Sequence, residues 1–144
     1  QKMKFFDVDE IIEKKQSMKI NDIFKKRGEN FFRTEEEKET LNCLEQNNCV
    51  IALGGGAFIN KNIRNDVLEK SISFWLDIDI KVINKRLKLK HDRPLTNVLD
   101  KKKKIDELYN KRKNIYKLAN HKIDCLEISK NDIAEKIISL YEKQ

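Results

Sequence analysis

Three of the four glycines in this 144-residue chain are consecutive, and they follow directly on a continuous apolar run. The run is Cys49–Leu53, and the glycines are Gly54, Gly55 and Gly56. A short apolar run without polar alternation is typical of a strand covered on both faces, as in a parallel sheet. Glycine after such a strand lets backbone N–H groups approach a ligand. The segment predicts a buried strand that leads into a ligand-binding turn; the alternative is a turn that only needs a positive φ.

The rest of the sequence alternates between short apolar runs and helical stripes. We expect strands at Met3–Asp7, Cys49–Leu53, Ile72–Leu76 and Lys122–Cys125, and helices at Glu10–Lys15, Lys19–Arg27, Glu29–Gln46, Asn62–Lys70, Ile80–Lys88, Lys101–Leu118 and Asn131–Tyr141. This alternation implies an α/β fold with a mostly parallel sheet, in one domain over residues 1–144. Ligands bind beyond the carboxyl ends of the strands in such sheets. Those ends carry Asp7–Asp9, Gly54–Gly56 and Asp77.

Composition excludes several classes of protein. No apolar run approaches the roughly 18 residues that cross a bilayer, and the first residues lack the apolar core of a signal peptide. The three cysteines contain no CxxC, which argues against a disulfide framework and against a zinc site. We therefore expect a cytoplasmic domain with no membrane contact.

The net charge of +7 raises the alternative of nucleic-acid binding. That function would need arginine and aromatic side chains on one face, whereas most of the 31 basic residues are lysines that we interpret as solvated surface. Arginine is the better partner for a carboxylate or a phosphate. Each of the six arginines is therefore a candidate ligand group: Arg27, Arg33, Arg64, Arg86, Arg93 and Arg112.

The pair Asp7 and Asp9 is a candidate catalytic site. If the segment is extended, the two carboxylates point the same way. One could then organise Mg²⁺ through water while the other orients or deprotonates a hydroxyl group. The alternative is that Asp9 merely caps the following helix.

Three arginine segments are candidate anion sites. Arg33 and Glu36 are spaced i, i+3 on a helix, so Glu36 could hold the guanidinium as a carboxylate clamp; the alternative is a surface ion pair worth roughly 0.3–0.5 kcal/mol. Arg93 lies in a polar stretch that resembles a lid, although Pro94 there could simply stiffen a loop. Arg112 is an arginine in a lysine-rich helix, where it could equally be surface charge.

Taken together, the segments FFDVDEIIE, IxDIFKKRGENFFRTEE, VIALGGGAF, DRPL and KRKNIY resemble the shikimate kinase family in order and spacing over nearly the whole chain. The resemblance implies a three-layer αβα parallel-sheet fold of the P-loop kinase type. It implies transfer of the ATP γ-phosphate to the 3-hydroxyl of shikimate, with Mg²⁺, in the biosynthesis of chorismate and the aromatic amino acids. It also implies a substrate-binding part at about 9–46 and a lid at about 88–100.

The resemblance assigns roles on the shikimate side of the site. Asp9 resembles the carboxylate that binds the shikimate hydroxyls and orients or deprotonates the nucleophile. Arg33, supported by Glu36, and Arg112 resemble the two arginines on the shikimate carboxylate. Gly54–Gly56 resemble a variant Walker B segment, with Gly55 nearest the substrate.

The resemblance also assigns roles on the nucleotide side. Asp7 resembles the acid that helps to organise Mg²⁺, Arg93 resembles a lid arginine that reaches the ATP phosphates, and Arg86 is similar to an arginine that packs on adenine. The family opens with an apolar strand and GxxxxGK[ST], and this chain has neither. That strand would be central, so we expect a gap between the strands Cys49–Leu53 and Ile72–Leu76, and a monomeric fragment that is inactive or weak alone. The alternative is a non-catalytic shikimate-binding module.

Overall fold

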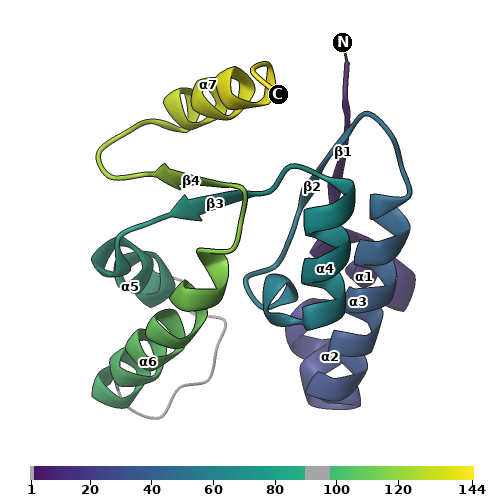
Figure 1. Cartoon of the computed structure of the whole chain (residues 1–144). Helices are drawn as coiled ribbons and strands as arrows, with labels where there is room; N and C mark the ends of the chain where they lie inside the picture. The colour runs from purple at the N-terminus through teal and green to yellow at the C-terminus, as the bar shows by residue number, and fades with distance from the viewer. Residues whose placement is uncertain (1, 90–97) are drawn as a thin grey trace. The chain divides into compact units, whose positions relative to one another are not determined.

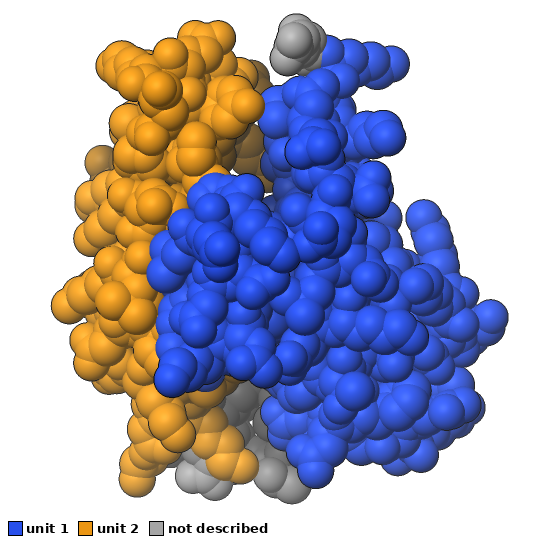
Figure 2. All heavy atoms as spheres, turned by 45° about the vertical axis from the view of Figure 1, so that its right-hand side comes forward, with its two compact units in different colours: residues 1–71 blue, residues 72–144 orange. Residues whose placement is uncertain are grey.

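The computed structural model describes residues 2–89 and 98–144 (Figure 1). The elements in chain order are β1 (Lys4–Asp7), α1 (Val8–Gln16), α2 (Ile20–Arg27), α3 (Glu29–Leu44), β2 (Cys49–Ala52), the 3₁₀ turn η1 (Ala57–Ile59), α4 (Lys61–Lys70), β3 (Phe74–Asp77), α5 (Ile80–Leu89), α6 (Val98–Tyr116), β4 (His121–Asp124) and α7 (Lys130–Tyr141). All the predicted strands and helices are present, with ends that differ by at most three residues. The chain divides into two compact units, residues 1–71 and 72–144, which Figure 2 distinguishes by colour. The single-domain expectation stays a prediction.

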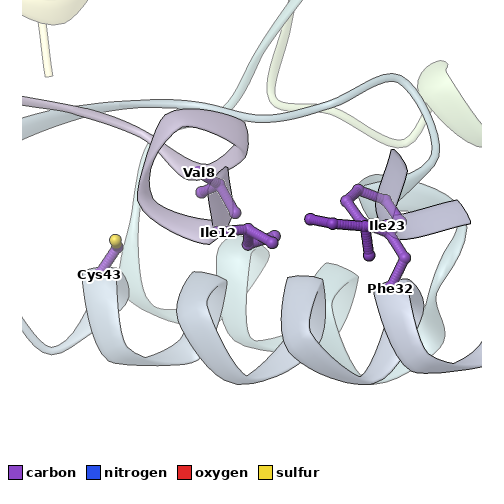
Figure 3. Close-up of a cluster of buried hydrophobic side chains, with 5 residues drawn as sticks. All are labelled: Val8, Ile12, Ile23, Phe32 and Cys43. Carbon is purple, nitrogen blue, oxygen red and sulfur yellow. The ribbon is translucent and has the colours of Figure 1, made fainter. Parts of the chain in front are cut away.

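Unit 1 is built on a parallel pair of strands, β1 and β2, with Phe6 opposite Ile51. Both side chains pack against a core formed by α1, α2 and α3. Figure 3 shows this core, whose buried members are Val8, Ile12, Ile23, Phe32 and Cys43. Each fully buried isoleucine contributes about 1.5–3 kcal/mol of hydrophobic stabilisation. The core therefore holds α1 and α3 firmly beside each other.

The opposite face of this strand pair is open within the described residues. Phe5 and Val50 are paired across the two strands, and their side chains are 65% and 49% exposed. Within unit 1, the helical core packs on the face of Phe6 and Ile51. The prediction that Cys49–Leu53 is also covered on its other face stays a prediction.

Helix ends in unit 1 follow local signals. Gly28 ends α2 and precedes α3 with φ +86° and ψ 168°, a backbone conformation that is essentially confined to glycine. The cap of α1 is Asp7, whose Oδ1 accepts a hydrogen bond from the Glu10 N–H at 3.2 Å. The alternative that Asp9 caps this helix is wrong, because Asp9 already lies in the first turn of α1.

Unit 2 contains a second parallel pair, β3 and β4. Its register is fixed by Ser73 and Asn120: Ser73 donates both its N–H (2.9 Å) and its hydroxyl (2.6 Å) to Asn120 Oδ1. Trp75 is buried against α6, with its ring 6.1 Å from that of Tyr116. The described strands form two separate pairs, β1–β2 in unit 1 and β3–β4 in unit 2; the expected gap between the strands Cys49–Leu53 and Ile72–Leu76 stays a prediction. None of the described helices is long and apolar enough to cross a membrane.

Candidate functional site

The glycine turn after β2 is the centre of the candidate site. Ala57 N–H donates to Gly54 O at 3.0 Å and Ile59 N–H donates to Gly56 O at 3.2 Å, so the chain passes from strand to 3₁₀ turn without a break. Gly28 is the glycine with positive φ among the described residues, and Gly56 has φ −91° and ψ −18°. The alternative that the triplet serves a positive φ is therefore wrong. Another requirement must account for the absence of side chains in the turn.

That requirement is close approach by charged side chains. A Cβ atom on Gly54 would lie 3.1 Å from Glu36 Oε1 and 3.3 Å from Asp9 Oδ1. A Cβ atom on Gly56 would lie 2.7 Å from the Cζ of Arg33, which is too close for any real side chain. The turn thus brings together an aspartate from α1 with an arginine and a glutamate from α3. Gly55, between them, is exposed.

Arg33 is held in place from two sides. Its Nη1 donates to Glu36 Oε2 at 2.7 Å, and its guanidinium lies 5.3 Å from the centre of the Phe32 ring. The Glu36 side chain is only 2% exposed, whereas that of Arg33 is 34% exposed. Because a buried carboxylate needs a partner, this is more than the surface ion pair considered as the alternative. A fixed and partly exposed guanidinium can bind an incoming carboxylate.

Asp9 has an oxygen that the described protein leaves unsatisfied. Its Oδ1 is buried and accepts no hydrogen bond from the described residues. Burial raises the pKa of Asp9, and the negative charges of Asp7 and Glu13 raise the pKa further, against an opposing effect of Arg33. Buried polar atoms are nearly always hydrogen-bonded, so an orphan beside a glycine turn indicates the place of a ligand group. A carboxylate with a raised pKa is also a better proton acceptor for a hydroxyl.

The backbone geometry predicted for Asp7 and Asp9 is wrong. The two residues are not in one extended segment, because Asp7 ends β1 and Asp9 belongs to α1. Helix formation wins over strand because Val8 is fully buried in the helical core with Ile12, at i, i+4. The two carboxylates are nevertheless close enough for the charge of Asp7 to raise the pKa of Asp9. The described residues contain no group of three or more potential metal ligands.

The remaining predicted residues lie in unit 2 or outside the described residues. Arg86 is exposed on α5, and Arg112 is partly buried on α6. Arg93 lies outside the described residues. The predicted lid overlaps the ends of both helices, since residues 88–89 belong to α5 and 98–100 to α6. The convergence of Arg112 with the groups of unit 1 stays a prediction.

The helix that carries Arg112 is anchored at a strand end. Tyr109 of α6 donates its hydroxyl to Asp77 Oδ1 at 3.2 Å, and Lys122 of β4 lies 2.8 Å from Asp77 Oδ2. Asp77 is the last residue of β3, at the edge of the strand pair where ligands of parallel sheets bind. Arg112 follows Tyr109 by three residues and so lies on the same side of α6.

Two further side chains, Arg64 and Glu37, support the segment that follows the glycine turn. Arg64 of α4 donates from Nη1 to the carbonyl oxygens of Phe58 and Ile59, both at 3.0 Å. Glu37 of α3 accepts hydrogen bonds at the start of α4. The scarcity of arginine was a signal for Arg64, but nothing in the sequence distinguishes Glu37 from its neighbouring glutamates.

Comparisons with known proteins identify the family of this chain. A family model described as shikimate kinase matches residues 1–142. The shikimate kinase of Sulfurihydrogenibium sp. (strain YO3AOP1) is 37% identical over 142 residues, which cover 99% of this chain and 84% of that protein. The shikimate kinase of Bartonella quintana is 36% identical over 134 residues, which cover 93% of this chain and 64% of that protein.

Solved structures show the same likeness. The structure of the Acinetobacter baumannii shikimate kinase in complex with shikimate matches with a TM-score of 0.89 at 29% identity, covering 98% of this chain and 79% of that one. The Aquifex aeolicus shikimate kinase matches with a TM-score of 0.82 at 31% identity, covering 98% of this chain and 83% of that one. The predicted αβα fold of the P-loop kinase type is thereby confirmed.

Proposed function

Because this chain belongs to the shikimate kinase family, a family of phosphotransferases that use ATP, we propose that it serves the phosphorylation of the 3-hydroxyl of shikimate. The observation that carries the proposal is the meeting of Asp9, Arg33 and Glu36 at the glycine turn. A shikimate kinase of this fold has been solved with shikimate bound. A small hydroxylated acid needs a cation for its carboxylate and an acceptor for its hydroxyl groups, and unit 1 offers both.

We propose that Arg33 binds the carboxylate of shikimate. Glu36 binds the guanidinium through Nη1 at 2.7 Å, and Glu29 Oε1 lies 3.5 Å from Nε, which leaves the N–H groups of Nη2 for the ligand. Arg112 would supply the second guanidinium. Two arginines that flank one carboxylate favour a ligand with a single anionic group and reject neutral polyols.

We propose that Asp9 orients and deprotonates the reacting hydroxyl. The hydroxyl oxygen attacks the γ-phosphorus of ATP, the bond to the bridging oxygen breaks, and ADP leaves with the electron pair. The hydroxyl proton passes to a carboxylate oxygen of Asp9. Its raised pKa makes Asp9 a stronger base than an exposed aspartate, and the orphaned Oδ1 provides an acceptor.

On the nucleotide side, Asp7 is the candidate ligand for Mg²⁺. Mg²⁺ is bound by one or two carboxylates together with substrate phosphates, and Asp7 fits because its helix cap uses Oδ1 only. When bound, the ion neutralises charge on the phosphates. Arg93 would reach those phosphates and Arg86 would pack on adenine. We propose that the protein is a cytoplasmic monomer without nucleic-acid or membrane partners, as befits an enzyme with two small substrates. Analytical ultracentrifugation would measure its oligomeric state.

Calorimetric titration with shikimate and, separately, with ATP tests the proposal. Arg33→Ala should weaken shikimate binding at least tenfold, since a charged hydrogen-bonding partner is lost, and should leave ATP binding unchanged. Arg27→Ala is the matched control, because Arg27 also lies over a phenylalanine ring, at 5.0 Å from that of Phe31. Equal weakening of both ligands, or equal effects of both variants, would contradict the clamp.

A turnover assay distinguishes a catalytically active shikimate kinase from a non-catalytic shikimate-binding module. Phosphate transfer should be assayed with this chain and with a version that has a strand and a GxxxxGK[ST] segment added before Gln1. Transfer that Asp9→Asn reduces by orders of magnitude supports a kinase with Asp9 as base. Shikimate binding without transfer in either version would indicate the non-catalytic binding module.

A further inference from the structure

The start of α4 is tied to α3 by an asparagine that serves two partners. Asn60 caps α4: its Oδ1 accepts hydrogen bonds from the N–H groups of Asn62 at 2.8 Å and Ile63 at 3.3 Å. Since the carbonyl side of the amide is used by the cap, its NH₂ group must find an acceptor elsewhere. That acceptor is Glu37 of α3, with a distance of 2.6 Å between Asn60 Nδ2 and Glu37 Oε2.

Glu37 uses its second oxygen in the same region. Its Oε1 accepts a hydrogen bond from Asn62 Nδ2 at 2.9 Å. Glu36, the preceding residue of α3, lies at the other end of the turn beside Gly54. Two successive carboxylates of α3 thus contact both ends of the segment 54–60.

The middle of this segment is fixed as well. Ala57 and Phe58 are buried, and Arg64 holds the carbonyl oxygens of Phe58 and Ile59. The glycine turn is tightly packed, because the spaces at Gly54 and Gly56 are too small for a methyl group unless neighbouring atoms move. A shift of the turn by a few tenths of an ångström would change its distances to Asp9 and Arg33.

We infer that Glu37 is a positioning residue, which through Asn60 sets the glycine turn at the distance from Asp9 and Arg33 that shikimate requires. The inference rests on the proposed function for its ligand, but not for its geometry. A carboxylate with both oxygens bound to amides of the segment 54–62 is placed to hold that segment in register with α3. The competing role is general packing of α3 against α4.

Three variants test the contact without removing the helix cap. Glu37→Gln replaces one acceptor oxygen by an NH₂ group that faces another NH₂ group. Asn60→Asp keeps an N-cap of equal quality but turns a carboxylate toward Glu37. The double variant Glu37→Gln/Asn60→Asp reverses the donor and the acceptor, so the hydrogen bond can form again.

Glu45→Gln is the matched control for packing. The carboxylate of Glu45 pairs with Lys70 at 2.6 Å and links the C-terminal ends of the same two helices. If Glu37 acted only through α3–α4 packing, both variants would have similar effects. If Glu37 positions the turn, only Glu37→Gln will change the site.

The position of the turn can be followed by NMR, because the chain has few glycines and three of them lie in the turn. Protein labelled with ¹⁵N-glycine gives four amide signals, of which Gly28 reports on unit 1 away from the turn. We expect each single variant to shift the signals of Gly54, Gly55 and Gly56 but not that of Gly28. We also expect each to weaken shikimate binding about tenfold, the effect of losing one well-placed hydrogen bond. The double variant should restore both properties.

Two results would overturn the inference: turn signals that stay in place in both single variants, or equal shifts in Glu45→Gln. Failure of the double variant to restore the signals would also count against it. If the wild-type chain binds no shikimate, the proposed function loses its support, while the glycine signals still decide whether Glu37 sets the turn.

Discussion

Replacing Gly56 with alanine would place a methyl group against the guanidinium of Arg33 without straining the backbone. Gly56 has φ −91° and ψ −18°, which alanine adopts readily. On the backbone alone, replacing glycine by alanine at such a position favours the folded state by about 0.4–1 kcal/mol, because the unfolded chain loses freedom, and this gain offsets part of the strain from the new methyl group. Gly56→Ala therefore separates an effect on the site from an effect on the fold.

The magnitude follows from the contact distance. The new Cβ atom would lie 2.7 Å from Cζ and Nη2 of Arg33, whereas ordinary contact begins at 3.4 Å. The guanidinium must therefore retreat by at least about 0.7 Å, because its Nη1 would lie still closer to the new Cβ atom than Cζ does. Misplacement of a positioning group by about 1 Å can lower a reaction rate on the order of a hundredfold. Retreat also strains the 2.7 Å bond to Glu36. We expect shikimate affinity to fall at least tenfold, which corresponds to about 1.4 kcal/mol.

The assay is calorimetric titration with shikimate, together with thermal unfolding of each variant. Gly28→Ala is the reciprocal control, because Gly28 has space for a methyl group but a backbone conformation that alanine resists. It should lower the free energy of unfolding by about 1–3 kcal/mol. In an Arg33→Ala background, Gly56→Ala should have no further effect on affinity, since the clash is gone. Unchanged affinity in the single variant would refute the placement of Arg33 at the turn.

Other predictions concern the acids of α1 and the second arginine. Burial raises the pKa of Asp9 in the folded protein, so its ionised form lowers the free energy of unfolding at pH values above the unfolded pKa of 3.8. Asp9→Asn should therefore raise the thermal unfolding midpoint at neutral pH and have little effect well below pH 3.8. Thermal denaturation measured over a range of pH tests this. The hydrogen bond from Ile20 N–H lowers the pKa of Glu13, so its contribution is present above pH 4.5 and is lost as the pH falls through its folded pKa. Glu13→Gln should therefore destabilise at neutral pH only, and equal loss at acid pH would contradict the assignment. Arg112→Ala should match Arg33→Ala in weakening shikimate but not ATP; weaker ATP binding alone would place Arg112 elsewhere.

Most helices and strands could be predicted from the sequence because they depend on local apolar patterns. The run Cys49–Leu53 and the stripe of α2 identify their elements without knowledge of the partner. The start of α1 was also encoded, since Asp7 followed by Glu10 three residues later is a typical helix N-terminus. The prediction that Asp7 to Asp9 is extended is wrong because it continues the apolar run of β1 past this helix-start signal.

The arrangement of the site could not be predicted as fully, because its charged side chains are buried by segments that are distant in the sequence. Periodicity assigns glutamates to the solvent, yet Glu36 and Glu39 of α3 are 2% and 3% exposed. Their burial is possible because Arg33 pairs with Glu36 and Lys15 of α1 pairs with Glu39 at 2.7 Å. The pair within α3 could be expected from its spacing. The pair between helices, and the contact of Glu36 with Gly54, depend on tertiary structure that no local pattern reveals.

Three features that cost stability coincide at the glycine turn, and their coincidence locates the site without reference to any relative. Gly56 leaves the turn without a side chain, at the entropic cost that glycine carries on folding, and a methyl group there would clash with Arg33. Asp9 Oδ1 is buried without a hydrogen bond from the described residues, and burial raises the pKa of the same group. A segment selected for stability alone would not need these features together. Their joint presence around Arg33 is what a binding site requires, because a ligand supplies the missing hydrogen bond and occupies the space that side chains leave.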